Sequence, residues 1–279
     1  MRTPLLSPES LAARLGEPEL VVLEVSFFEA PRADYATSHI PGARFSYWKD
    51  LLWHETQREF ATSQMLADRL GPLGVGDDST LVLVGDPLQF ATYAYWVLTM
   101  AGLAEHAYVL DGGRRTWTAR HQPTTSDVPP NAPQGLRAGQ ADHSSRIGRD
   151  EVREGLGRPE RVILDLRSLE EFTGQRVAPL SAPFDHGAER RGHIPGARHL
   201  PVERLLRDEG TFAGADELRG AFEDVGALDA GEVVATCRLG HRASLGWFAL
   251  TQLLGREHVR VYDGSWTEWG SIVGFPIEN

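Results

Sequence analysis

The sequence predicts an α/β protein with two similar domains, each a parallel β-sheet flanked by helices on both faces. Three observations lead to this expectation. The string HIPGAR occurs twice, short apolar runs alternate with amphipathic ones, and both halves present these pieces in the same order. Alternating strands and helices are typical of parallel sheets, because a crossover helix must return the chain before the next parallel strand can form.

The repeated string shows which parts of the two halves correspond. SHIPGARF spans Ser38–Phe45, and GHIPGARHLPV spans Gly192–Val202. An apolar run ending in an acid precedes each copy, with Glu24 in the first half and Asp165 in the second. The repeat period is about 150 residues, a common domain length, so the pattern indicates a duplicated domain and not a solenoid.

The remaining pieces also correspond. After each copy, a second apolar run (LVLVGD or VVATC) leads into a helical stretch that ends at a glycine, a common helix C-cap. A third run (AYVL or VRVY) then leads into DGGRRTW or DGSWTEW. Each half is therefore predicted to run strand, helix, strand, helix, strand.

A stretch rich in proline, glycine, serine and asparagine separates the halves and is typical of a linker. We predict a first domain at 1–125, a linker at 126–145 and a second domain at 146–279. The composition, 41% apolar and 24% charged, is that of a globular protein. Because a duplicated chain has less need of dimerisation, we expect a monomer.

Charge and cysteine content exclude several classes of function. The net charge of -11 argues against nucleic acid or a membrane surface as a partner. One cysteine excludes an internal disulfide framework and a multi-cysteine metal site, so we expect no metal and no cofactor. The N-terminus lacks the apolar run of a signal peptide and indicates a helix capped by Ser7 or Ser10. No run is long enough to span a bilayer, and a cytoplasmic location, where a free thiol persists, is expected.

The single cysteine, Cys237, lies in the stretch VVATCRLGHRAS, directly after the second strand of the second half. Ligand sites in parallel sheets lie beyond the carboxyl ends of the strands. Gly240 permits a positive φ, so the loop from Arg238 to Arg242 can curl until its backbone amides and two guanidinium groups converge on an anion. Free cysteines are usually small buried hydrophobes, but these surroundings favour a reactive thiolate.

With these pieces in order, the chain resembles the rhodanese family of tandem-domain sulfurtransferases. The paired HIPGA segments, the CRLGHR loop and the YDGSWTEWG segment carry the resemblance, which covers almost the whole chain. It implies two rhodanese-like domains, of which the C-terminal one carries a cysteine that becomes a persulfide. The first half has LVGDPLQFAT where the second has ATCRLGHRAS, with Asp86 or Gly85 in place of the thiol. We therefore expect the first domain to be catalytically inactive and to help wall the cleft.

The expected reaction is a two-step transfer of sulfur. Ionised Cys237 would attack the outer sulfur of an anionic donor, and the resulting persulfide would pass that sulfur to cyanide, a small thiol or thioredoxin, with ping-pong kinetics. Loops with an arginine after the cysteine resemble thiosulfate sulfurtransferases, whereas CGSG loops resemble mercaptopyruvate enzymes. Arg238 therefore favours thiosulfate, a compact dianion. A 3-mercaptopyruvate sulfurtransferase stays open as the alternative.

Substrate contacts are expected from the loop itself. Arg238 and Arg242 would hold the anion, although each is also compatible with a solvated surface charge. His241 is expected to line the entrance, and an exposed histidine without catalytic duty is an equal alternative. The predicted binding loop comprises Arg238, Leu239, Gly240, His241 and Arg242.

One departure from the family affects a further contact. Many family members have an arginine after the phenylalanine that follows the first strand of the second domain. Here that stretch is EEFTGQR, with Thr173 at the matching place, so Arg176 is predicted to substitute. Arg190 and Arg191 are further candidates, and all three fit plain surface charges equally well.

Several other residues are expected to be structural. His39 and His193 occur in both halves, including the one without a thiol, so each is predicted to bond backbone within a turn. Asp111 and Asp263 are predicted to be helix N-caps. The strand-end acids Glu24 and Asp165 are assigned structural roles. The tryptophans Trp117, Trp266 and Trp269 are assigned to the core.

Two rival functions fit a cysteine loop on this fold. A cysteine phosphatase needs a longer loop with an arginine six positions after the cysteine, where Ala243 stands here. A non-enzymatic sulfur carrier would hold the persulfide and hand it to one protein partner, and the intact loop is compatible with that role.

Overall fold

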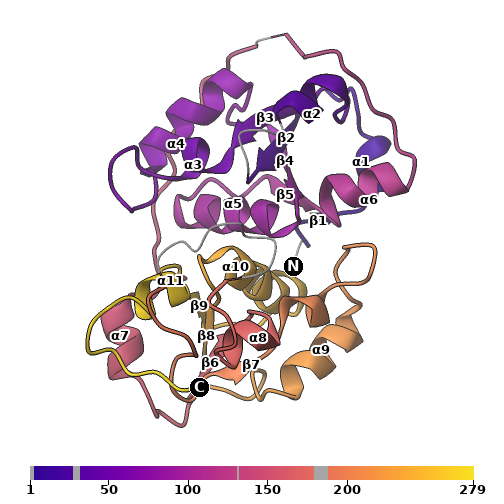
Figure 1. Ribbon diagram of the computed structural model, residues 1–279. Helices are drawn as coiled ribbons and strands as arrows, with labels where there is room; N and C mark the ends of the chain where they lie inside the picture. Colours follow the sequence, from indigo (N-terminus) through magenta and orange to yellow (C-terminus); the bar gives the residue numbers. More distant parts are fainter. Residues whose placement is uncertain (1–2, 28–31, 131, 179–187) are drawn as a thin grey trace. The chain divides into compact units, whose positions relative to one another are not determined.

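The computed structural model describes residues 3–27, 32–130, 132–178 and 188–279. The chain divides into two compact units (Figure 1). The first comprises Met1–His143 and Asp208–Thr211, and the second comprises Ser144–Arg207 and Phe212–Asn279. No helix within the described ranges is both long and apolar enough to cross a membrane.

The first unit is built on a five-stranded, fully parallel sheet with the strand order β1-β5-β4-β2-β3. Its strands are β1 (Leu5–Leu6), β2 (Leu20–Ser26), β3 (Arg44–Tyr47), β4 (Thr80–Asp86) and β5 (Ala107–Leu110). Its helices are α1 (Pro8–Ala12), α2 (Arg32–Thr37), α3 (Trp48–Leu52), α4 (Ser63–Leu70), the 3₁₀ turn η1 (Gly71–Leu73), α5 (Gln89–Met100) and α6 (Gly113–Ala119).

Helices cover both faces of this sheet. On one face, Val22, Val82 and Leu110 pack against Leu11 of α1 and Trp117 of α6. α5 contacts β4 and β5 and lies on the other side of the sheet (Figure 1). This arrangement confirms the predicted fold class for the first half.

The second unit repeats the plan with a four-stranded parallel sheet in the order β7-β6-β8-β9. Its strands are β6 (Arg161–Asp165), β7 (Arg198–His199), β8 (Glu232–Thr236) and β9 (Val259–Val261). Its helical segments are α7 (Arg149–Glu154), α8 (Leu169–Phe172), η2 (Val202–Leu205), α9 (Ala215–Glu223), α10 (His241–Phe248), the π turn η3 (Ala249–Leu253) and α11 (Ser265–Trp269).

The two cores match in detail. Trp117 and Trp269 are both fully buried, and each donates its indole N–H to a proline carbonyl shortly after its own helix, Pro123 at 2.9 Å and Pro276 at 2.7 Å. Trp266 is also buried, 1% exposed. The prediction that these three tryptophans belong to the core is confirmed.

The two HIPGA histidines are structural, as predicted. The Nδ1 atom of His39 bonds the Tyr35 carbonyl at 2.7 Å, and that of His193 bonds the Phe172 carbonyl at 2.9 Å. Each imidazole also stacks on the ring of that same aromatic residue. The histidines therefore pin the turn that leads into β3 or β7.

The prediction that Asp111 and Asp263 cap helices was wrong. The N-cap positions of α6 and α11 are taken by Gly112 and Gly264, with no side-chain cap at either. Each aspartate lies one residue before the N-cap position. Asp263 instead accepts a hydrogen bond from Nε of Arg146 at 2.9 Å.

Strand register identifies the residue that replaces the thiol in the first unit. Glu24 pairs with Val84 in the first sheet, and the equivalent Asp165 pairs with Thr236 in the second. The residues that follow, Gly85 and Cys237, therefore correspond, which decides between the two sequence-based candidates.

The backbone around Gly85 leaves no room for a side chain. A Cβ built there would lie 2.6 Å from the Ala91 amide nitrogen and 2.8 Å from the Pro87 carbonyl oxygen. Gly113, at the start of α6, has φ +58, and a Cβ on it would overlap the Gly85 carbonyl oxygen. These two glycines allow the segment after β4 and the start of α6 to pack backbone against backbone.

We predict that Gly113→Ala lowers the free energy of unfolding by about 3 kcal/mol or more, because it adds a steric clash with backbone to the cost of a positive φ. Gly42→Ala is the matched control: Gly42 also has a positive φ, +78, but a Cβ there meets nothing within 4 Å. It should lose only about 1–2 kcal/mol. Urea denaturation measures both, and equal losses would contradict the close packing at Gly113.

Candidate functional site

The only cysteine lies at the carboxyl end of β8, where the sequence places it. Cys237 is 2% exposed, and its Sγ accepts a hydrogen bond from the Gly240 amide at 3.2 Å. Gly240 adopts φ +89 and forms the N-cap of α10, as its predicted conformational freedom allows. The short loop thus turns back on its own first side chain and aims a backbone donor at the sulfur.

His241 does not sit in the loop. It is the first residue of α10 and is only 5% exposed, because the left-handed turn at Gly240 starts the helix immediately. The alternative of an exposed histidine was therefore wrong, whereas a contact of His241 with substrate at the entrance of the site stays a prediction. Leu239 is half-buried.

The two loop arginines are not solvated surface charges either. Arg238 is 8% exposed, and its carbonyl accepts the Thr267 amide at 3.1 Å. The Arg242 side chain is 13% exposed and lies in α10, one residue after the helix begins. Within five positions of the thiol, one cationic residue is therefore buried and a second is mostly buried.

Arg242 forms a two-point ion pair with Glu171 of α8. Its Nη1 lies 2.7 Å from Oε2 and its Nη2 lies 2.8 Å from Oε1 of that carboxylate, which is fully buried. Planar guanidinium and carboxylate groups match in this fork geometry, which makes such pairs strong. The pair ties α10 to α8, although the two residues are 71 positions apart.

Glu171 also fixes the charge on Arg242. Burial acts to lower the pKa of Arg242, but the hydrogen bonds and charge of Glu171, with smaller contributions from Cys237 and Asp165, raise that pKa above its ordinary value. Burial acts to raise the pKa of Glu171, but Arg242, with smaller contributions from the Ser168 amide and Arg167, more than offsets this and lowers that pKa below its usual range. Both groups stay ionised at neutral pH, and the charge of Arg242 interacts with Cys237.

A second buried ion pair supports the first. Arg167 is fully buried and bonds both carboxylate oxygens of Asp165, with its Nη2 2.7 Å from Oδ2. Its other contacts reach the carbonyls of Gly192 and Glu171 and the ring of Trp266. Asp165 is therefore neutralised within the fold, in agreement with its predicted structural role.

Sequence reasoning missed Arg167. The signal that could have found it is the string LDLRS, in which a strand-end acid is followed two residues later by an arginine. In an extended strand, residues two apart lie on the same face, so the two side chains can meet.

The start of α11 holds the backbone behind the thiol. The Cys237 amide donates to Oγ of Ser265 at 3.1 Å, and the Cys237 carbonyl accepts the Trp266 amide at 3.1 Å. With the bond from Thr267 to Arg238, three hydrogen bonds fix the two residues from which the site projects. Ser265 was also missed, although the contrast between DGG and DGS in the two halves marks it.

The structure places Arg176 next to α8. Its Nη2 lies 3.3 Å from Oε2 of Glu170, and its own amide donates to the Glu170 carbonyl. Thr173, at the position where the resemblance led us to expect an arginine, donates its hydroxyl to the Leu169 carbonyl at 2.8 Å. A role for Arg176 in binding substrate thus stays a prediction.

Arg190 has a different environment. Its guanidinium group donates to four backbone carbonyls near the C-terminus, those of Trp269, Gly270, Ile272 and Phe275. Arg190 therefore ties the C-terminal segment down, whereas Arg191 is exposed.

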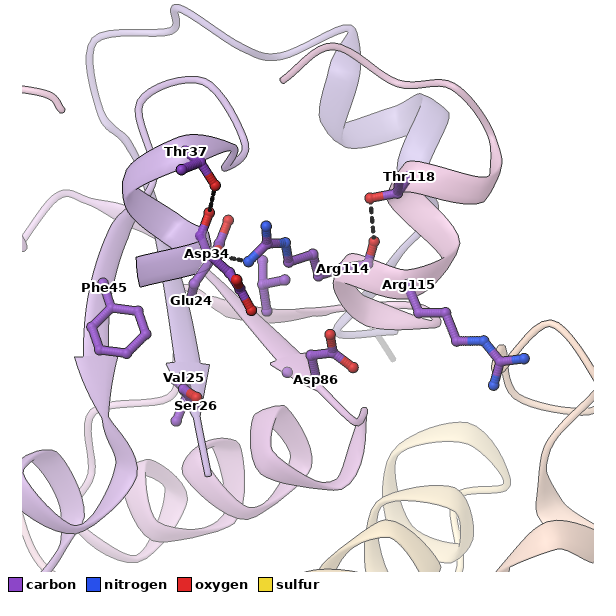
Figure 2. Close-up of a pocket in the computed structure, with 12 residues that line it drawn as sticks. Glu24, Val25, Ser26, Asp34, Thr37, Phe45, Asp86, Arg114, Arg115 and Thr118 are labelled. Atoms are coloured by element: carbon purple, nitrogen blue, oxygen red, sulfur yellow. Dashed lines mark hydrogen bonds and ion pairs between the residues drawn. The ribbon is translucent and has the colours of Figure 1, made fainter. Parts of the chain in front are cut away.

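The first unit has a cavity of about 410 Å³ at the carboxyl ends of β2 and β4, shown in Figure 2. Glu24 points into it, accepts the Ile40 amide at 3.1 Å and lies 3.7 Å from Nη1 of Arg114. Burial raises the pKa of Glu24 and that of Asp86 above their usual values. The carboxyl end of the first sheet thus has two carboxyl groups, Glu24 and Asp86, beside Gly85, the residue that stands in place of the thiol.

We predict that Glu171→Gln lowers the free energy of unfolding at pH 7 by about 3–5 kcal/mol, because Arg242 is left buried and unpaired. A carboxylate whose folded pKa is depressed stabilises the fold above its unfolded pKa, and this contribution disappears as the pH falls through the folded pKa. The native protein should therefore lose more stability than the variant between pH 7 and pH 3.

The matched control is Glu170→Gln, which changes the neighbouring, partly exposed carboxylate that pairs with Arg176. Urea denaturation across the same pH range should show little change for this variant. Equal losses of stability in the two variants would mean that the buried Arg242 pair stabilises the fold no more than the partly exposed Arg176 pair does.

Comparisons with known proteins identify the family of both halves of the chain. A protein-family model described as "Rhodanese-like domain" matches the chain twice, over residues 7–120 and 148–272. A Haloferax volcanii protein named "Putative thiosulfate sulfurtransferase" is 41% identical over 247 residues, covering 88% of this chain and 84% of that protein. The "Sulfur carrier protein TtuD" of Thermus thermophilus is 36% identical over 281 residues, covering 98% of this chain and 95% of that protein.

Solved structures show the same fold at lower identity. YnjE is 24% identical with a TM-score of 0.81, covering 99% of this chain and 68% of that chain. EanB in complex with ergothioneine is 23% identical with a TM-score of 0.82, covering 99% of this chain and 70% of that chain. The chain therefore belongs to the rhodanese-like family, with two tandem domains that support sulfurtransferase activity.

Proposed function

We propose that the protein is a thiosulfate sulfurtransferase whose persulfide forms on Cys237. The observation that carries this proposal is the sulfur at the carboxyl end of β8, which accepts the Gly240 amide at 3.2 Å and interacts with the charge of Arg242. A backbone donor and a nearby cation favour an anion on that sulfur. Relatives named for thiosulfate support the choice of donor.

In the first step, the Cys237 thiolate attacks the outer sulfur of thiosulfate. A Cys–S bond forms, the S–S bond of thiosulfate breaks, and sulfite leaves with the bonding electron pair. In the second step, an acceptor such as cyanide attacks the outer sulfur of the persulfide and leaves as thiocyanate, which regenerates the thiolate. No proton moves in either step with these substrates, so no general base is needed, and the cycle is ping-pong.

The loop residues have complementary roles in this proposal. The amides that begin at Gly240 stabilise the negative charge as it moves from the thiolate to the outer sulfur. Arg238 neutralises the donor dianion. Arg242, whose terminal nitrogens are held by Glu171, acts through its charge and by fixing the loop. Arg176 and the side of Leu239 complete the proposed binding surface.

The remaining partners follow from the same chemistry. We propose a small thiol or thioredoxin as an acceptor besides cyanide, a monomeric protein, a cytoplasmic location, and no nucleic-acid or membrane partner. The first domain is proposed to be catalytically inactive.

We predict that the intact mass of the protein rises by one sulfur atom after treatment with thiosulfate, and that Cys237→Ser gains none. Sulfite should appear in equal amount, and cyanide should remove the added mass as thiocyanate. Mass spectrometry and the ferric-thiocyanate colour reaction measure both steps. An unchanged native mass would rule out the persulfide mechanism.

Two alternatives on the same loop are separated by substrate. If 3-mercaptopyruvate is the donor, its kcat/KM will exceed that of thiosulfate, and Arg238→Gly will widen the difference. If the protein is a sulfur carrier, as TtuD is named, it will gain the persulfide but turn over slowly with cyanide.

A phosphatase is disfavoured by loop length, because Ala243 occupies the sixth position after Cys237 and Arg242 comes one residue early. Arg242 is moreover paired with Glu171 through both terminal nitrogens. Hydrolysis of an aryl phosphate that depends on Cys237 would overturn the assignment.

A further inference from the structure

Ser265 has an unusual backbone for its residue type. It begins α11 with φ +51, one of three positive-φ residues other than glycine in the described part of the chain, and it is fully buried. A side chain in this left-handed region costs about 1–2 kcal/mol, so the surroundings must hold it there.

The Ser265 hydroxyl has used all its hydrogen-bonding capacity. It donates to the Tyr262 carbonyl at 2.7 Å, and its oxygen lies 3.1 Å from the Cys237 amide and 3.3 Å from the Thr236 hydroxyl. A hydroxyl has one donor and two acceptor sites, and these three bonds account for all of them. It therefore has no proton to exchange with the sulfur of Cys237.

The hydrogen bonds from the start of α11 fix the orientation of the Cys237 backbone and therefore of its side chain. The Cys237 amide is held by Ser265, and the Cys237 carbonyl is held by the Trp266 amide. These two bonds fix the peptide groups on either side of the cysteine, and its Sγ then accepts the Gly240 amide. Loss of the Ser265 bond would free the peptide on which this second contact depends.

The first unit shows that the turn itself does not need the hydroxyl. Gly113 occupies the equivalent position with φ +58 and forms the same strand-to-helix turn. A Cβ at Gly113 would overlap the carbonyl oxygen of Gly85, the residue equivalent to Cys237. The hydroxyl and the thiol thus occur together in one unit and are absent together from the other.

We infer that Ser265 is a positioning residue: its hydroxyl fixes the Cys237 peptide so that the Gly240 amide points at the sulfur. The role deepens the proposed function and rests on Cys237 being the nucleophile. It concerns the geometry of the thiol and not the identity of the donor.

Two substitutions separate the hydroxyl from the backbone strain. Ser265→Ala keeps the Cβ and removes the hydroxyl, and Ser265→Gly removes both. We expect each to lower kcat for sulfur transfer from thiosulfate to cyanide by about 10–100-fold, as for other outer-shell partners, with KM for thiosulfate changed by less than about twofold. Alkylation of Cys237 by iodoacetamide should slow near pH 7, and its pH–rate profile should move to higher pH.

Thr236→Val is the matched control. It removes a buried hydrogen bond to the same Ser265 oxygen but leaves the bond from the Cys237 amide in place. Its Tm should fall as much as that of Ser265→Ala, whereas its alkylation profile should match the native protein. If Ser265→Ala does not fold, Ser265→Gly gives the same readout without strain.

The two proposals fail in different ways. A native protein that is alkylated rapidly but gains no sulfur from thiosulfate contradicts the proposed function, and the alkylation profiles still test Ser265. Native alkylation rates and an unshifted profile in Ser265→Ala or Ser265→Gly would overturn the positioning role. A shift of equal size in Thr236→Val would overturn it too, because the effect would then be general loosening of the core.

Discussion

The buried ion pair between Arg242 and Glu171 is the constraint on which the second unit depends. Taking two charges out of water is costly, and the attraction between them offsets this only when the geometry is good and the remaining polar atoms are bonded. Both terminal nitrogens of Arg242 meet the carboxylate, and the backbone amide of Ser168 bonds Glu171 as well. The pair therefore joins α8 to the first turn of α10 in one register, and the loop that carries the thiol begins and ends on fixed elements.

A second pair, between Arg167 and Asp165, leaves the site with a simple balance of charge. Each buried carboxylate near the thiol has its own arginine, so neither adds an uncompensated negative charge. The Gly240 amide bonds the sulfur directly, and the charge of Arg242, although paired with Glu171, also acts on Cys237. This arrangement suits a reaction in which one negative charge persists throughout and only shifts from one sulfur to the next.

The two units separate scaffold from chemistry within one chain. Both contain a HIPGA histidine that bonds backbone and a buried tryptophan that bonds a proline carbonyl. Both also have a positive-φ residue at the start of the helix that follows the last strand. Only the second has side chains where the end of the central strand meets the start of the last helix, at Cys237 and Ser265. In the first, Gly85 and Gly113 let backbone pack on backbone, and the neighbouring cavity is lined by acids whose pKa values burial raises. The fold thus tolerates either a packed turn or a reactive one at the same place.

The amino-acid sequence by itself determined the duplication, the parallel sheets, the structural histidines and the position of Cys237 after β8. These features depend on periodicity and on local sterics, such as the positive φ of Gly240, which neighbouring residues encode. Tertiary structure decided the partners: Glu171 for Arg242 across 71 positions, Ser265 for Cys237 across 28, and burial instead of exposure for His241. It also showed that Asp263 pairs with Arg146 and caps no helix. The partner of a charge or a buried amide depends on which elements meet in space, and no local pattern contains that information.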